Sequence, residues 1–175
     1  PGWAGFPLGQ RLRDALQVPV LIETDVGAAA LAEHRLGAGQ GCGTMAYLTV
    51  GTGIGVGIRV DAAGLHGRLH PELGHMRIAR DAGDTFRGTC PFHGDCWEGL
   101  ASGPALLSRA RRSVGPLPPE HPAWSTEAGL LARGVHVLLS GLALERVVLG
   151  GGVGTAPGLL ARVRAALGAI DGGYT

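Results

Sequence analysis

The 175-residue chain contains no lysine and no asparagine, and all 15 of its basic residues are arginine. Any role that these two amino acids commonly fill must therefore fall on another residue or on the backbone. A Walker phosphate loop is excluded, because that loop requires a lysine. Aromatic residues make up 5% of the chain and hydrophobic residues 45%, so the core must consist mostly of alanine, valine, leucine and isoleucine.

Other absences narrow the class of protein. The formal net charge is +1 and no basic patch with interleaved aromatic residues occurs, which argues against nucleic-acid binding. No apolar run is long enough to cross a bilayer, and no signal-peptide pattern is seen. Cysteine is scarce, with three residues, and this usage favours the reducing cytoplasm. The length fits one domain or one large lobe of an enzyme.

Hydrophobic periodicity and turn residues predict mixed strands and helices, and therefore a layered α/β domain. Strands are expected at 18–23, 44–50, 54–60 and 146–149, with the second and third joined as an antiparallel hairpin by a glycine turn. Helices are expected at 11–16, 28–36, 97–112, 126–144 and 157–167, with an interruption at Gly103-Pro104 and ends at Gly37 and Gly168. Residues 1–10 are expected to be extended, and 114–122 to form a proline-rich loop.

A cluster of soft metal ligands is the most informative pattern in the chain. Cys90, His93 and Cys96 follow one another at intervals of three, and His75 lies upstream. Two sulfurs and two imidazoles form the ligand set of a closed tetrahedral zinc site. The alternative is a disulfide between Cys90 and Cys96 with idle histidines. Cys42 is left over, and we expect it to be a small buried apolar group.

Two glycine-rich turns are candidate phosphate or nucleotide contacts. Gly51-Thr52-Gly53-Ile54-Gly55 joins the two hairpin strands, and its backbone amides and Thr52 hydroxyl could approach phosphate oxygens. Gly150-Gly151-Gly152 follows a strand and precedes a helix, where ligands gather in α/β folds. The alternatives are a plain hairpin turn and a tight strand-to-helix turn.

Acidic residues supply the remaining candidates. Asp25 stands where a strand gives way to a helix, so its carboxylate could project into a cleft; the alternative is a helix N-cap. Glu72 lies three residues before His75 and could accept hydrogen bonds from sugar hydroxyls, or it could be a surface residue. Asp95 and Glu98 are expected to stay solvated or to cap the helix that starts at Trp97.

These motifs, in this order, resemble the ROK group of sugar kinases and sugar-responsive repressors, and the bacterial fructokinases of that group most closely. The resemblance implies an actin-like, ribonuclease-H-like ATPase fold. It further implies that residues 1–175 form a single partial domain, the C-terminal lobe of a sugar kinase, with a zinc-binding loop at about 69–96. The chain departs from the family at Gly27, where asparagine is common, and shows no Asp-x-Gly-Gly-Thr phosphate loop. The matching segments are 23–26, 51–55, 70–75, 90–96, 98–104 and 149–153.

The resemblance also assigns roles to the candidates. Asp25 would be the general base that deprotonates a hexose, and Glu72 and His75 would stand at the sugar. The expected cofactors are Mg²⁺ and a structural Zn²⁺, with ATP as co-substrate. D-fructose is the favoured sugar, a homodimer is expected, and no nucleic-acid or membrane partner is expected. The alternatives are a sugar-sensing repressor of the same family and a zinc-ribbon nucleic-acid module. Phosphates would bind at Gly51, Thr52 and Gly53, the nucleoside at Gly151 and Gly152, and zinc at His75, Cys90, His93 and Cys96.

Overall fold

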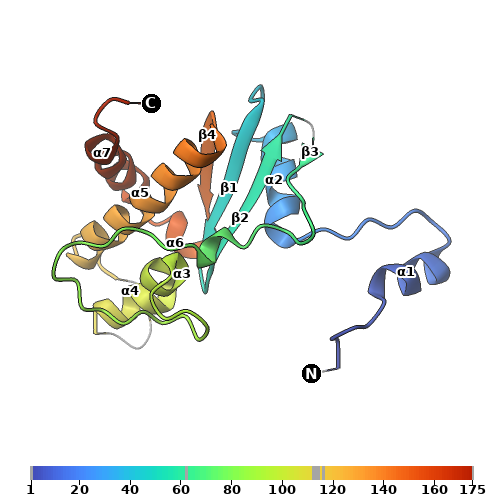
Figure 1. Ribbon diagram of the computed structural model, residues 1–175, viewed down its shortest axis with the longest axis horizontal. Coiled ribbons are helices and arrows are strands. Elements are labelled where there is room, and N and C mark those ends of the chain that lie inside the picture. Colours follow the sequence, from blue (N-terminus) through green and yellow to red (C-terminus); the bar gives the residue numbers. More distant parts are fainter. Residues whose placement is uncertain (1, 62, 112–114, 116, 175) are drawn as a thin grey trace.

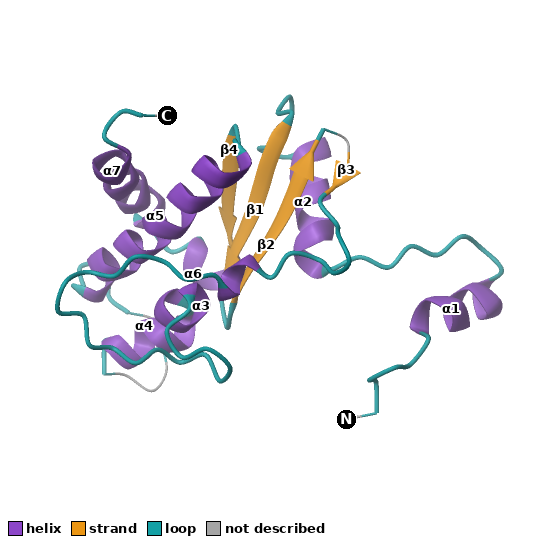
Figure 2. Ribbon diagram, viewed as in Figure 1, coloured by secondary structure: helices purple, strands orange, loops and turns teal. Residues whose placement is uncertain are grey.

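A mixed β-sheet with helices on both faces forms the body of the molecule (Figures 1 and 2). The structure is a computed structural model that describes residues 2–61, 63–111, 115 and 117–174. Within this part of the chain the strand order is β3-β2-β1-β4. The strands are β1 (Thr44–Val50), β2 (Ile54–Val60), β3 (Ala63–Gly64) and β4 (Arg146–Gly150). The helices are α1 (Leu8–Leu16), α2 (Asp25–Leu36), η1 (Leu73–His75), α3 (Trp97–Ala101), α4 (Gly103–Arg109), α5 (Ala123–Leu142), α6 (Gly151–Gly154) and α7 (Leu159–Asp171).

The two central strands form the predicted hairpin with the predicted bounds. β1 pairs with β2 in antiparallel register from Thr44 opposite Val60 to Val50 opposite Ile54. β4 lies on the other side of β1 and runs parallel to it. β4 was expected to be buried, but its first four residues are exposed or half-buried, because in the described chain no strand covers its outer edge.

Side chains of the two central strands alternate between the two faces of the sheet, and each face packs against a different layer of helices. The even-numbered residues Ala46, Leu48 and Val50 of β1 belong to the main core, as do Val56 and Ile58 of β2. They pack with Trp97 of α3 and with the buried stripe of α5, which includes Leu130, Leu131 and Leu138. Helix α2 lies against the opposite face of β2. The glycine turn between β1 and β2 therefore emerges between the two helical layers.

The expected strand at 18–23 is wrong. This segment and α1 extend away from the sheet (Figure 1), and Val18, Leu21 and Ile22 are 51%, 87% and 56% exposed. A strand requires a hydrogen-bonded neighbouring strand, and no strand among the described residues pairs with this segment. The apolar, β-branched composition is strand-like, but composition does not supply a partner.

The other differences concern element ends. Helix α1 begins at Leu8, inside the segment expected to be extended. Helix α7 continues past Gly168 to Asp171, and Gly172, with φ +63°, provides the left-handed C-cap instead. Helices α3 and α4 are separated at Ser102, close to the expected interruption, and expectations for residues 112–114 and 116 lie outside the described residues. In the described part of the chain, no helix combines the length and apolar character needed to cross a membrane.

Candidate active site and metal centre

A cavity of about 390 Å³ opens where the start of α2, the β1–β2 turn and the segment before η1 meet. Asp25, Gly51, Thr52, Gly53 and Glu72, five of the residues predicted from the sequence, line it together. They come from three segments far apart in the chain, so the fold brings together what the sequence motifs suggested separately. Their neighbours in the wall are Thr24, Val26, Thr49, Ile54, Gly55, Val56, His70, Pro71, Leu73, Gly74 and Glu98.

Asp25 is not the helix N-cap. Thr24 has that role, because its hydroxyl accepts a hydrogen bond from the Gly27 amide at 3.0 Å. Asp25 is the first residue of α2, and its Oδ1 accepts from the Val26 amide at 2.8 Å. The capping interpretation of Asp25 is therefore wrong, and its exposed carboxylate remains available at the cavity wall. Beside it, the Thr24 amide donates to Glu23 and lowers the pKa of that carboxyl group.

Two glycines of β2 allow α2 to come this close to the turn. A Cβ atom at Gly57 would lie 2.0 Å from the Val26 carbonyl oxygen, and one at Gly55 would lie 2.7 Å from the Val26 side chain. Both glycines stand on the face of β2 that the core does not use. The start of α2 therefore packs directly on the strand backbone, and this contact sets Asp25 beside the glycine turn.

The glycine turn itself is held from both ends. The Gly51 amide donates to the Gly53 carbonyl at 2.9 Å, which closes the turn, and the Gly51 carbonyl accepts from the Gly103 amide at 2.7 Å. A Cβ atom at Gly51 would meet nothing within 4 Å, so its outer side is open. Such a turn can present backbone to a ligand in the cavity.

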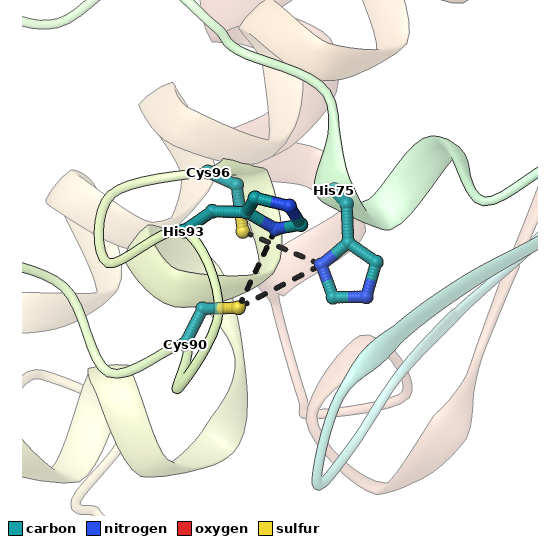
Figure 3. Close-up of side chains that lie close together, drawn as sticks. All are labelled: His75, Cys90, His93 and Cys96. Carbon is teal, nitrogen blue, oxygen red and sulfur yellow. Dashed lines mark hydrogen bonds between the residues drawn. The ribbon is translucent and has the colours of Figure 1, made fainter.

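The segment around η1 supplies Glu72 and His75. Gly74 lies against β2 so closely that a Cβ atom there would be 2.0 Å from the Ile54 carbonyl oxygen. A hydrogen bond of 2.7 Å joins Glu72 Oε1 to His70 Nε2, and the Glu72 side chain is 63% exposed. His75 follows three residues later; it is not among the residues that line the cavity, and its Nδ1 atom faces the cysteines (Figure 3).

Four side chains converge as the metal motif predicts. Figure 3 shows His75 facing the loop that carries Cys90, His93 and Cys96. The His75 Nδ1 atom lies 3.7 Å from Cys90 Sγ and 3.6 Å from Cys96 Sγ, and His93 Nδ1 lies 3.8 Å from Cys90 Sγ. A tetrahedral ion with zinc–sulfur bonds of ~2.3 Å and zinc–nitrogen bonds of ~2.0–2.1 Å separates sulfur from nitrogen by about 3.5 Å. The donor set and its spacing therefore fit zinc.

The disulfide interpretation does not hold, because Cys90 and Cys96 are both free thiols in the structure. Cys42 is also free and is buried, as expected for a small apolar side chain. Each of the two motif cysteines is buried, whereas His93 lies at the surface. The site is thus closed on its inner side by protein.

Ion pairs fasten the loop that leads to the metal ligands. Asp95 pairs with Arg77 and Arg80, so the expectation that it stays solvated or caps a helix is wrong. Arg80 also reaches Asp84, and Arg109 of α4 makes two hydrogen bonds to the Asp84 carboxylate. The bonds from Arg109 lower the pKa of Asp84 to about 2. Residues 77–95 are in this way tied to α4.

Glu98 belongs to the cavity, and the expectation that it is solvated or a cap is also wrong. Its Oε2 atom accepts from the Ile54 amide at 3.0 Å, and its Oε1 atom lies 4.0 Å from His75 Nδ1. It is the site residue that sequence reasoning missed. The sequence does contain one indication that Glu98 belongs to the site, because Glu98 stands two residues after the metal ligand Cys96, on the buried helix α3.

Gly151 and Gly152 lie apart from this cavity. Gly152 lines a second cavity of about 340 Å³, whose wall is mostly apolar and includes Leu106, Trp124 and Val153. Gly151 has φ +85°, and a Cβ atom there would lie 2.4 Å from the Val50 carbonyl oxygen. Gly103, whose amide binds the Gly51 carbonyl, also lines the second cavity, so the two cavities flank the same turn.

The ROK family pattern matches residues 1–170, and the chain therefore belongs to the ROK family. Among curated proteins, a fructokinase of Zymomonas mobilis is 40% identical over 99% of this chain and 59% of its own length. Among solved structures, the ROK hexokinase of Thermus thermophilus matches with a TM-score of 0.83 and 33% identity, over 97% of this chain and 62% of that one.

A ROK glucokinase from Streptomyces griseus, solved with glucose and AMPPNP, matches with a TM-score of 0.70 and 28% identity, over 91% of this chain and 61% of that one. The fold is accordingly the actin-like ATPase fold of the ROK sugar kinases, as the motifs indicated. The chain spans about three-fifths of the length of these relatives.

Proposed function

We propose that the whole protein transfers the γ-phosphoryl group of ATP to a hexose. The hexose we propose is D-fructose, and the group that is phosphorylated is its 6-hydroxyl. The observation that carries this proposal is the shared cavity, which has the Asp25 carboxylate, the turn Gly51–Gly53 and Glu72 in one wall. A carboxylate beside a phosphate-binding turn is the arrangement that phosphoryl transfer to a hydroxyl requires.

Asp25 is the general base of the proposed reaction. Its carboxylate accepts the proton of the sugar hydroxyl as that oxygen attacks the γ-phosphorus, and ADP leaves as the bond to its β-phosphate oxygen breaks. Among the described residues Asp25 accepts one hydrogen bond, from the Val26 amide, and forms no ion pair, so its second oxygen is available to the hydroxyl. Little covalent chemistry is asked of the protein, and positioning supplies most of the rate.

The nucleotide extends across both cavities in this proposal. Gly51, Thr52 and Gly53 hold the phosphates: the Gly51 amide closes the turn, and the Thr52 and Gly53 amides and the Thr52 hydroxyl donate to the phosphate oxygens. The nucleoside lies along Gly151 and Gly152, next to the second cavity, whose apolar wall suits a purine base. When bound, Mg²⁺ supplies neutralisation of the phosphate charge.

Glu72 and His75 form the sugar side. The exposed Glu72 carboxylate can accept hydrogen bonds from hydroxyls, and η1 sets it against the cavity. Zinc is structural: when bound by His75, Cys90, His93 and Cys96 it supplies a rigid anchor for this loop. His75 therefore serves both the metal and the position of the sugar loop.

The choice of fructose draws support from the Zymomonas mobilis relative, which is named a fructokinase. The Streptomyces griseus relative was solved with glucose, so glucose is the principal competitor. A sugar-sensing repressor of the same family is the second candidate, with less support because these relatives are kinases. Homodimer formation and a cytoplasmic location remain predictions.

The test is a kinase assay on the complete gene product with ATP, Mg²⁺ and a panel of fructose, mannose, glucose and N-acetylated hexoses. We expect fructose 6-phosphate, and we expect Asp25→Asn to lower kcat by about 10²–10⁴-fold with a small change in KM. The exposed Asp14 on α1 provides the control, because Asp14→Asn should leave turnover unchanged. Turnover by Asp25→Asn close to the natural rate would remove Asp25 from the role of base.

A further inference from the structure

We propose that Glu98 is a positioning residue that couples the metal centre to the glycine turn, so that the metal organises the phosphate side of the cavity as well as the sugar side. The mechanical part of this inference stands on contacts alone. Its consequence for the reaction rests on the proposed function.

The two oxygens of Glu98 face two different parts of the site. Oε2 accepts a hydrogen bond from the Ile54 amide, the first residue after the turn, at 3.0 Å. Oε1 lies 4.0 Å from His75 Nδ1, the same atom that faces both cysteine sulfurs. The side chain is 23% exposed, so solvent competes only in part for these contacts. A charged acceptor on a backbone amide is among the stronger hydrogen bonds in a protein.

The turn has no side chain at the point where the carboxylate contacts it. A Cβ atom on Gly53 would lie 2.4 Å from Glu98 Oε2, so the carboxylate packs against the bare backbone of the turn. The other end of the turn is held by the Gly103 amide, which donates to the Gly51 carbonyl. Both restraints come from residues 98–103, immediately after the last metal ligand.

Helix α3 transmits the position of the metal loop to Glu98. Its first turn starts from the ligand Cys96, whose carbonyl accepts from the Leu100 amide at 3.0 Å. Gly99 packs against the same loop so tightly that a Cβ atom there would lie 1.8 Å from the Gly94 carbonyl oxygen. The Trp97 amide donates to the Met76 carbonyl at 2.9 Å, next to His75. A shift of the loop therefore shifts Glu98, and with it the turn.

Hydrogen exchange of the Ile54 amide measures this coupling directly. The 175-residue chain is prepared zinc-loaded and zinc-free, as the natural sequence and as Glu98→Ala and Glu98→Gln, and zinc content is measured for each. Glu145→Ala is the matched control, because Glu145 accepts from the Gly43 and Thr44 amides at the far end of β1. It should release those two amides and leave Ile54 protected.

We expect Glu98→Ala to retain zinc and to raise the exchange rate of the Ile54 amide about tenfold or more, because a hydrogen bond to a charged group is lost. Zinc removal should raise it similarly in the natural chain and add little in Glu98→Ala. Glu98→Gln, whose amide oxygen still accepts, should give an intermediate increase. Should Glu98→Ala not fold, the same comparison is made with Glu98→Gln.

An unchanged Ile54 exchange rate in the Glu98 variants would overturn the proposal. So would a zinc effect on Ile54 that is equally large with and without the carboxylate. In the complete enzyme, Glu98→Ala should raise KM for ATP, whereas Asp25→Asn acts on kcat. A natural enzyme without kinase activity would refute the proposed function and leave the exchange result standing, so the two failures are distinguishable.

Discussion

At the scale of single residues, the site depends on positions where only a hydrogen atom fits. Gly57 admits the Val26 carbonyl, and Gly74 admits the Ile54 carbonyl, each at a distance that no Cβ atom tolerates. These glycines carry no chemistry, yet they bring α2 and η1 against β2. Gly27 differs: a side chain there would meet the Glu23 carboxylate, which instead binds His66. Gly27 thus leaves room for the hydrogen bond between Glu23 and His66.

Glu127 is a residue-scale source of pH dependence. It is 0% exposed in α5, and neither carboxylate oxygen has a hydrogen-bond partner in the part of the chain that the structure describes. Burial raises the pKa of Glu127 well above its usual value, and the charge of Arg109 lowers it only in part. The folded protein therefore holds a proton that the unfolded chain releases above pH ~4.3, so this contribution to stability is present below that pH and is lost as pH rises toward the folded-state pKa.

We therefore expect Glu127→Gln to flatten the pH dependence of stability. Near pH 8 the variant should be more stable than the natural chain, because glutamine cannot ionise and so bears none of the cost of keeping a buried carboxyl group protonated, and the difference should shrink toward pH 4. Urea unfolding at a series of pH values measures it. Glu120→Gln, at an exposed position, is the control and should change nothing. A difference that grows as pH falls would contradict the assignment.

The pKa of Asp84 shifts in the opposite direction to that of Glu127, so its contribution to stability changes with pH in the opposite sense. Its pKa is lowered to about 2 by the hydrogen bonds from Arg109, so its contribution to stability is present above pH ~4 and is lost as pH falls toward 2. Taken alone, these two groups contribute most to stability at pH ~4, where folded Asp84 is ionised and Glu127 keeps its proton. The metal loop, which Asp84 fastens through Arg80, should therefore loosen in acid.

At the scale of elements, helix α5 holds the layer that carries Glu98. The indole nitrogen of Trp97 donates to the Leu130 carbonyl at 3.1 Å, and the ring lies over Gly134. A Cβ atom at Gly134 would be 2.1 Å from that ring, whereas one at Gly129, in the same helix, would meet nothing within 4 Å. Helix α5 thus contains one glycine in contact with the Trp97 ring, Gly134, and one glycine with open space beside it, Gly129.

Alanine substitution should separate the two. Gly134→Ala forces the Trp97 ring and α5 apart and should destabilise the protein by about 2–3 kcal/mol. Gly129→Ala improves helix propensity without a clash and should stabilise it by about 0.5–1 kcal/mol. Urea unfolding at one pH gives both values. Equal effects of the two changes would mean that the Trp97 contact does not restrain α5.

The sequence predicted elements best where local pattern and tertiary setting agree. Strands 44–50 and 54–60 have the predicted bounds, because alternation, β-branched residues and a glycine turn all favour a hairpin. The segment 18–23 has an equally strand-like composition but lacks a neighbour in the described chain, which no local pattern reveals. Gly168 looked like a helix end, but its position in α7 is tolerated, and Gly172 ends the helix.

At the scale of the whole molecule, residues far apart in sequence make one site. The metal ligands could be found from spacing, because their chemistry is written in the residue types. Asp25, the glycine turn and Glu72 could be nominated separately, but their common cavity could not be read from the sequence. Glu98 was missed because its role lies in a contact with a backbone amide 44 positions away. The separate cavity at Gly152 was likewise visible only in the fold.

The metal centre gives the last prediction. Because four ligands from residues 75–96 must be assembled by folding, zinc should bind the folded chain and not the unfolded one. We expect one zinc ion per chain, and a free energy of unfolding that rises by about 1.4 kcal/mol for each tenfold increase in free zinc above Kd. Unfolding in zinc buffers of defined free concentration measures this slope.

The three cysteines supply matched variants for that measurement. Cys90→Ser and Cys96→Ser remove ligands and should abolish both the bound ion and the slope, whereas Cys42→Ser, at a buried free thiol outside the cluster, should retain them. The loss should also propagate to the β1–β2 turn through α3, because Glu98 and Gly103 follow the last ligand. If Cys96→Ser still binds zinc, or if the free energy of unfolding does not change with free zinc concentration, these side chains converge for another reason.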